Sequence, residues 1–321
     1  MIEFIIGGIM GTKIFKTLDE QIGILKSKGL VIDDVEYAKK IVLRENYFFL
    51  MGYRHLFMKE ENIKEFKTNT NFRELYALFS FDRQLRNIIF KNILIIENNA
   101  KSIFSYILSQ KYGYKEKDYL RNINFNQSPE KQRQVNDLLR KMKRQIRING
   151  GQHEATKHYI NNYGYIPLWV VVKVLSFGIT SELYTILKPS DQKEIAKEYN
   201  IDPESLMVFL PILSNYRNLC AHEDILFEHK TQKVIPDNVF HASLNIPRVN
   251  GEYIYGKGDL FSVVLIFRYL LSKDDFRLFM NELTYEIDHL SGCLKTIPIE
   301  KVLDRMGFPI NFKALLEIEL D

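Results

Sequence analysis

The stretch FRELYALFSFDRQLRNIIFKNILIIENNAKSIFSYILSQKY, residues 72–112, decides the fold class. Its apolar side chains recur at intervals of three and four residues, which is the period of one face of an α-helix. These apolar positions are Leu75, Leu78, Phe79, Leu85, Ile88, Ile89, Ile95 and Ile96. Neither proline nor glycine interrupts the stretch before Gly113. The spacing therefore predicts one long helix from Phe72 to about Tyr112.

The segments around this helix show the same periodicity. Near the start of the chain, Thr17 is followed three positions later by Glu20, which is the pattern of a capping box, and Gly29 marks the helix end. A further helix, rich in basic residues, is predicted to run from about residue 130 to Ile148. Few segments alternate with the period of two that a half-buried strand requires. The sequence therefore predicts an all-α fold.

Three segments break this pattern. Residues 113–130 have the composition of a loop, and residues 228–258, with two prolines and three glycines, predict an irregular connection with room for a small hairpin. The apolar run after Pro167 is too long for one strand, so it predicts two buried helices with a kink near Gly178. We expect Trp169 and Phe177 in this run to serve packing.

Composition limits the class of protein. Of the 321 residues, 46% are hydrophobic and 26% are charged, which is ordinary for a globular protein. No apolar run reaches the roughly 18–20 residues that cross a bilayer, so no membrane partner is predicted. The only two cysteines, Cys220 and Cys293, lack metal-ligand spacing, and this low content fits a reducing compartment. We therefore expect a cytoplasmic protein.

The first residues, MIEFIIGGIMG, superficially resemble a secretory signal. No positive charge precedes the short apolar run, and Glu3 stands where a signal would be basic. A second methionine, Met10, offers another start. We expect residues 1–11 to be a non-native or disordered extension, with the true start, Met1 or Met10, left open.

The net charge of +4 is small, but its distribution is uneven. Between Lys131 and Arg147 lie seven cations, opposed there only by Asp137: Lys131, Arg133, Arg140, Lys141, Lys143, Arg144 and Arg147. Such a run is commonly a solvated helix face. Alternatively it binds RNA, because clustered cations gain free energy when they release counterions from a phosphate backbone. Both interpretations stay open.

A polar cluster interrupts the apolar segment SNYRNLCAHEDIL, residues 214–226. Asn218 and His222 are four residues apart and project from nearly one face of a helix. Arg217 and His222 are separated by about 140° on an ideal helix, so they meet only if the helix end loosens or a second subunit completes the site. In many proteins such a histidine simply bonds a nearby carboxylate, and spacing alone leaves this alternative open.

The cluster suits acid–base chemistry on a phosphodiester. Histidine titrates near neutral pH and can accept or donate a proton, while the fork of donors on Arg217 can neutralise a pentavalent phosphate. One imidazole cannot be base and acid at once, so a homodimer with two copies of the site is expected. The sequence has no P-loop, GxGxxG, HExxH or paired CxxC motif, so it predicts no cofactor and no metal site.

Several blocks, in this order, resemble the Abi-like, or abortive infection, bacteriophage-resistance family of the HEPN superfamily. They are LDEQIGILKSKGL, FFLMGYRHLF, FRELYALFSFDRQLRNIIFKNILIIEN, PLWVVVKVLSFGITSELYTIL, LSNYRNLCAHEDILF, GDLFSVVLIFRYLL and MGFP. The resemblance covers about residues 12–312. It implies an all-α, HEPN-type helical bundle with N-terminal and C-terminal helical extensions. On this basis we expect an extension at 1–11, an N-terminal helical region at 12–70, a core at 71–227, an irregular connection at 228–258 and a C-terminal helical region at 259–321.

The resemblance also implies a metal-independent endoribonuclease signature, R-x4-6-H, carried here by Arg217, Asn218 and His222. Many members have a second histidine after the first, and Glu223 stands there instead. Glu97 and Asp82 match recurring polar positions of the family and are expected to support the site, either directly or through ion pairs with Arg83, Arg86 or Arg217.

The resemblance implies an anti-phage toxin that cleaves RNA and is held inactive until infection. A protein or small-RNA antitoxin is one form of restraint, and the sequence does not identify it. The main alternative is a non-catalytic HEPN module that binds RNA or protein. A purely structural helical adaptor would leave the polar cluster unexplained.

Overall fold

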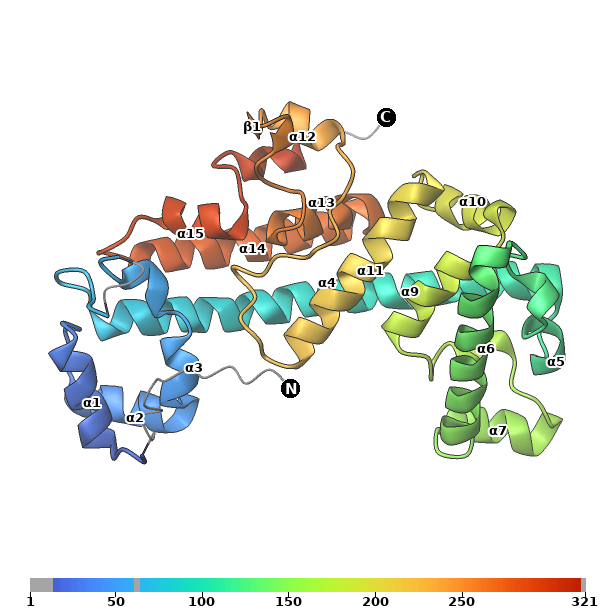
Figure 1. Ribbon diagram of the computed structural model, residues 1–321, viewed down its shortest axis with the longest axis horizontal. Coiled ribbons are helices and arrows are strands. Elements are labelled where there is room, and N and C mark those ends of the chain that lie inside the picture. Colours follow the sequence, from blue (N-terminus) through green and yellow to red (C-terminus); the bar gives the residue numbers. More distant parts are fainter. Residues whose placement is uncertain (1–13, 61–63, 319–321) are drawn as a thin grey trace, which may run out of the picture. The chain divides into compact units, whose positions relative to one another are not determined.

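The fold of the chain is given by a computed structural model that describes residues 14–60 and 64–318. These residues form fifteen α-helices, three short 3-10 helices and one two-stranded hairpin, so the all-α prediction is confirmed. The expected extension at residues 1–11 lies outside the described residues. None of the described helices is both long enough and apolar enough to cross a bilayer. The chain divides into two compact units, whose elements are labelled in Figure 1.

The first unit comprises the described residues up to Ser80 together with Leu290–Pro298. The Thr17 hydroxyl accepts a hydrogen bond from the Glu20 N–H at 3.3 Å, and the Glu20 carboxylate accepts one from the Thr17 N–H at 2.8 Å, which confirms the capping box. Gly29 follows the helix with φ of 84°, a conformation that favours glycine. The elements of this unit are α1 (Leu18–Ser27), α2 (Val35–Glu45), α3 (Tyr47–Met51), the 3-10 helix η1 (Arg54–Phe57) and the start of α4.

Helix α4 runs from Phe72 to Tyr112, which confirms the predicted long helix. The boundary between the two units falls inside it, after Ser80. The part of α4 in the second unit buries apolar residues such as Leu85 and Ile89, and it also buries four charged side chains: Asp82, Arg86, Glu97 and Lys101. Buried charges require partners, so these four side chains must be paired within the unit.

The second unit contains the rest of the chain. Its elements after α4 are α5 (Glu116–Tyr119), η2 (Asn122–Asn124), α6 (Pro129–Asn149), α7 (Glu154–Tyr163), α8 (Leu168–Val171), α9 (Phe177–Ile186), α10 (Pro189–Lys197), α11 (Pro203–Ala221), α12 (Val239–Ser243), β1 (Arg248–Val249), β2 (Glu252–Tyr253), α13 (Leu260–Leu270), α14 (Lys273–Cys293, which ends in the first unit), α15 (Ile299–Met306) and η3 (Phe312–Leu316). The predicted loop at 113–130 is therefore wrong in part, because two short helical turns and the start of α6 lie within it.

The core of the second unit forms around α13. All eight residues from Leu260 to Phe267 have no exposed surface. Helix α11 packs against α9, α10 and α13, and α6 also packs against α9 (Figure 1). The hairpin lies in the irregular connection, where Asn250 and Gly251 turn the chain with φ of 52° and 87°.

The apolar run after Pro167 forms the two predicted helices, α8 and α9. The break between them lies at residues 172–176, and Gly178 is inside α9. Phe177 is 1% exposed, as its packing role requires, but 47% of Trp169 is exposed to solvent. Trp169 therefore packs with only part of its side chain, against the Tyr114 ring at 5.8 Å.

Candidate functional site

The end of helix α11 presents the Arg217–His222 motif. Asp202 caps the start of the helix by accepting a hydrogen bond from the Ser205 N–H at 2.7 Å. The last helical residue is Ala221, and His222 is the C-cap, whose N–H donates to the Asn218 carbonyl at 3.0 Å. The imidazole therefore leaves from the point where the helical path ends. The angle of about 140° expected for a regular helix does not constrain it.

The chain turns away from α11 in a Schellman motif. The Asp224 N–H donates to the Leu219 carbonyl at 3.3 Å, and the Glu223 N–H donates to the Cys220 carbonyl at 3.4 Å. Glu223 has φ of 59°, although glycine is the usual residue at this position. A non-glycine residue in this conformation costs roughly 1 kcal/mol, so the surrounding contacts must hold the turn.

Two buried charges of α4 hold the segment that follows His222. Asp82 has no exposed surface, and its carboxylate accepts hydrogen bonds from the N–H groups of Leu226 at 3.1 Å and Phe227 at 2.7 Å. The same carboxylate is paired with the Arg86 guanidinium, which also donates to the Asp224 carbonyl at 3.2 Å. Asp82 and Arg86 therefore fix the backbone of the turn.

A second buried carboxylate of α4 faces Arg217. Glu97 Oε1 accepts a hydrogen bond from Lys101 Nζ at 2.6 Å, and Glu97 Oε2 lies 3.8 Å from Arg217 Nε. Both Glu97 Oε2 and Arg217 Nε are buried, and neither makes a hydrogen bond within the part of the chain that the structure describes. The Arg217 guanidinium also lies 5.6 Å from the centre of the Phe90 ring. Contacts from α4 thus hold Arg217 in place.

The charge at this cluster does not cancel. One carboxylate, Glu97, is shared by two cations, Lys101 and Arg217, which leaves a net positive charge. Lys101 is buried, while the Arg217 side chain is 34% exposed, so the excess charge reaches solvent at Arg217. A partly desolvated guanidinium with excess positive charge suits an anion such as phosphate.

The remaining predicted site residues are open to solvent. Asn218, His222 and Glu223 are all exposed. Arg217 and Asn218 thus lie in the last turn of α11 and His222 at its C-cap, with Glu97 Oε2 facing Arg217 Nε at 3.8 Å. Asp82 contacts the turn rather than these side chains, and Glu223 contributes its backbone conformation.

His229 follows α11 in the chain and contacts the helix, but the sequence did not indicate it as a candidate site residue. Its Nε2 lies 2.8 Å from Asn215 Oδ1, and the Tyr216 hydroxyl donates to the His229 carbonyl at 3.1 Å. Burial lowers the pKa of His229, which favours the neutral imidazole. No sequence signal pointed to this contact, because His229 follows the end of α11 and is 14 residues from Asn215 in the chain.

Cys220 lies between the motif residues but does not resemble a nucleophile. It is buried and free, as expected from the sequence, and burial raises the pKa of its thiol to about 12. Nowhere in residues 14–60 and 64–318 do three or more His, Cys, Asp or Glu side chains gather to hold a metal ion.

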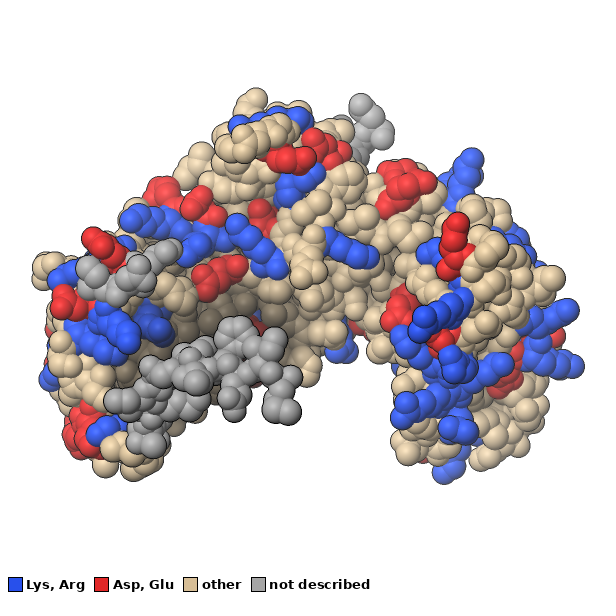
Figure 2. All heavy atoms as spheres, in the orientation of Figure 1, with Lys and Arg blue, Asp and Glu red and all other residues tan. Residues whose placement is uncertain are grey.

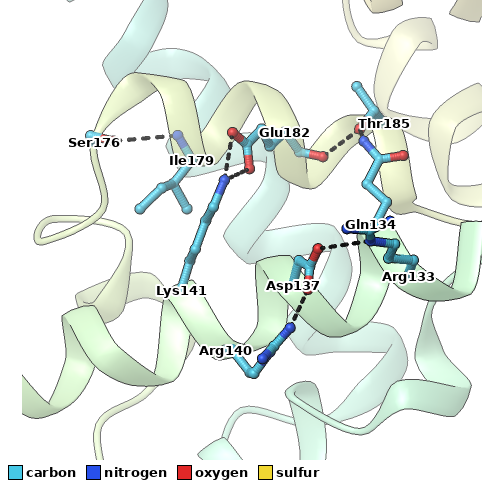
Figure 3. Close-up of polar contacts among 9 residues, drawn as sticks. All are labelled: Arg133, Gln134, Asp137, Arg140, Lys141, Ser176, Ile179, Glu182 and Thr185. Carbon is cyan, nitrogen blue, oxygen red and sulfur yellow. Dashed lines mark hydrogen bonds and ion pairs between the residues drawn. The ribbon is translucent and has the colours of Figure 1, made fainter. Parts of the chain in front are cut away.

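The predicted basic helix is α6, and Figure 2 shows Lys and Arg side chains gathered along it. Four of its seven cations have local polar partners. Arg133 and Arg140 pair with Asp137, and Lys141 pairs with Glu182 of α9 at 2.8 Å (Figure 3). Lys131 donates to Gln134 at 3.0 Å.

The remaining three cations, Lys143, Arg144 and Arg147, lie toward the end of α6. All three are exposed, and none forms an ion pair with another described residue. Helix α6 packs on the unit through its buried face, formed by Val135, Leu138, Leu139 and Met142. The helix therefore combines a solvated, locally paired first half with an unpaired cationic end.

The sequence matches one known family of proteins. The profile of the Abi-like protein family matches residues 40–228, which include α4, α6, α9, α11 and the Arg217–His222 motif. The chain therefore belongs to the Abi-like protein family. No curated protein and no solved structure matches the chain.

Proposed function

We propose that this protein is an abortive-infection effector of the HEPN type that cleaves RNA without a metal ion, using Arg217 and His222. Membership of the Abi-like family suggests a role in abortive-infection defence. The observation that carries the proposal is the Arg217 guanidinium, held by Glu97 and Phe90 while excess positive charge faces solvent beside an exposed histidine.

In the proposed reaction the ribose 2′-hydroxyl attacks the adjacent phosphorus. A neutral imidazole takes the hydroxyl proton while the 2′-oxygen bonds phosphorus. The bond from phosphorus to the 5′-oxygen breaks, and that oxygen receives a proton from an imidazolium. The products are a 2′,3′-cyclic phosphate and a 5′-hydroxyl. The two donors of the Arg217 fork stabilise the pentavalent phosphorane, and Asn218 orients the phosphate or the imidazole.

The base and the acid are two different groups in this scheme. A homodimer that joins the two motif segments supplies two copies of His222, and we propose this arrangement. His229 of the same chain also lies near α11, but its imidazole is held by Asn215 and its backbone carbonyl by the Tyr216 hydroxyl. We place the protein in the cytoplasm, where an antitoxin, either a protein or a small RNA, would restrain it.

The second candidate function is a non-catalytic RNA-binding module. The unpaired cations Lys143, Arg144 and Arg147 favour it, because they suit a phosphate backbone whether or not the protein cleaves RNA.

One experiment separates the two functions. The purified protein is incubated with a pool of cellular RNAs in EDTA, and the ends of any fragments are mapped. Cleavage with 2′,3′-cyclic phosphate ends that is lost in His222→Ala supports the enzyme. His289→Ala is the control, because this histidine of α14 is also exposed and lies outside both the motif and the basic helix. Cleavage that survives His222→Ala, or that stops in EDTA, refutes the proposed mechanism.

A further inference from the structure

A row of aromatic rings lies on the second unit, apart from the Arg217 motif. Successive ring centres are 5.8 Å apart from Trp169 to Tyr114, 5.7 Å to Tyr165, 6.3 Å to Tyr163 and 5.4 Å to Tyr159. Three of these rings are exposed: Trp169 by 47%, Tyr114 by 42% and Tyr163 by 57%. A contiguous exposed patch of aromatic side chains often marks a binding site.

One end of this row lines a hollow of about 410 Å³ between α4 and α8. Its aromatic walls are Tyr106, Tyr114 and Trp169, and its other lining residues are three serines and Gln110. No aliphatic side chain of the described residues lines it. Flat rings with hydroxyl and amide groups between them suit a flat ligand with a polar edge.

One of these polar groups has no partner. The Ser109 hydroxyl oxygen is buried and makes no hydrogen bond with any described residue. By contrast, the Ser105 hydroxyl donates to the Ser102 carbonyl at 2.9 Å. A buried hydroxyl without a partner costs free energy, and a ligand that bonds it would recover that cost.

Positive charge adjoins the rings. Lys115 Nζ lies 4.8 Å from the centre of the Tyr165 ring and 5.9 Å from that of Tyr114. Two residues further on, Lys117 lines a second hollow with Lys143 and Arg147, the unpaired cations of α6. The one acid there, Glu116, already accepts a hydrogen bond from the Ile166 N–H at 2.6 Å. The two hollows together therefore offer aromatic faces and net positive charge.

We infer that the hollow at Tyr106, Ser109 and Trp169 binds an unpaired nucleobase of single-stranded RNA, whose phosphates follow Lys115 toward the cationic end of α6. Bases stack on aromatic faces, and their edges bond hydroxyl and amide groups, while lysine and arginine neutralise the backbone. This inference rests on the proposed function only in taking RNA rather than DNA as the ligand.

The test uses the fluorescence of Trp169, which is the only tryptophan of the chain. Full-length His222→Ala protein is titrated with an eight-nucleotide oligoadenylate, with the matched RNA duplex, and with single-stranded DNA of the same sequence. We expect saturable quenching by the single strands and little by the duplex, at equal phosphate concentration. Tighter binding of RNA than of DNA would identify RNA as the ligand.

Variants locate the binding. Loss of one stacking ring weakens binding by about 5- to 150-fold, so Tyr106→Ala should do so. Tyr106 is 69% exposed, and its loss will not unfold the protein. Ser109→Ala should weaken binding by about 2- to 10-fold. Tyr285→Ala, a tyrosine of α14 that is 68% exposed, is the matched control and should bind as the parent does.

Absence of quenching by every oligonucleotide, equal quenching by duplex and single strand, or unchanged binding by Tyr106→Ala would each overturn the inference. The first result would also direct attention to a protein partner. Cleavage by the wild-type protein is measured separately. Binding without cleavage would refute the proposed enzyme and support the nucleobase site. Cleavage without quenching would support the enzyme and refute the nucleobase site.

Discussion

Replacing Glu97 by glutamine tests how α4 supports Arg217. Glu97 is 6% exposed and Lys101 is 8% exposed, so the substitution leaves a buried ammonium without its carboxylate. Breaking a buried ion pair in this way costs about 3–5 kcal/mol. For a unit of this size, that loss lowers the melting temperature by roughly 6–20 °C.

A double variant separates stability from function. Glu97→Gln with Lys101→Met removes both buried charges, and replacement of a buried pair by neutral groups is often close to neutral for stability. We expect the double variant to melt near the wild type, yet to cleave RNA at least about tenfold more slowly, because Arg217 has lost the carboxylate that positions it.

Thermal unfolding followed by circular dichroism gives the stability, and single-turnover cleavage of a mapped RNA gives the rate. If Glu97→Gln alone is as stable as the wild type, the Glu97–Lys101 pair is not buried as described. A stable double variant with wild-type activity would restrict Glu97 to a structural role.

Three further predictions concern other parts of the chain. Gly307→Ala should destabilise the second unit by several kcal/mol, seen as a large fall in melting temperature, because an added Cβ would lie 2.1 Å from Asp259 Cγ and φ there is 76°. Near-normal stability would contradict this packing. Burial raises the pKa of Asp259 to about 7, so the folded state binds more protons and stability should fall, by at most about 4 kcal/mol, as pH rises from about 4 to 7. Asp259→Asn should flatten that slope in pH-dependent denaturation, and an unchanged slope would contradict it. Light scattering at micromolar concentration should show a homodimer, whereas a strict monomer would remove support for the composite site.

The local features of the fold could be predicted because neighbouring residues determine them. The long α4 helix and the capping box at Thr17 depend on spacing and caps within a few residues. The short helices after Tyr112 could not be predicted, because isolated turns have no periodicity and tertiary contacts hold them. The exposure of Trp169 could not be predicted, because an apolar run does not show which of its faces stays exposed.

The candidate site could be predicted only as a motif. Arg217, Asn218 and His222 could be selected from one short stretch. The hydrogen bonds from the N–H groups of residues 226 and 227 to Asp82 join positions about 145 apart in sequence, and no local pattern encodes them. The sharing of Glu97 between Lys101 and Arg217 is likewise visible only once α4 and α11 cross.

The most direct test of the central claim is the single-turnover cleavage rate of Arg217→Lys beside wild type and Arg217→Ala. Lysine keeps the positive charge but loses the planar fork of donors that the phosphorane requires. We predict that Arg217→Lys is nearly as inactive as Arg217→Ala, while His222→Ala falls by about 10²–10⁴-fold, the usual contribution of a positioned acid or base. Cleavage by Arg217→Lys at close to the wild-type rate would contradict the assignment of Arg217 to the transition state.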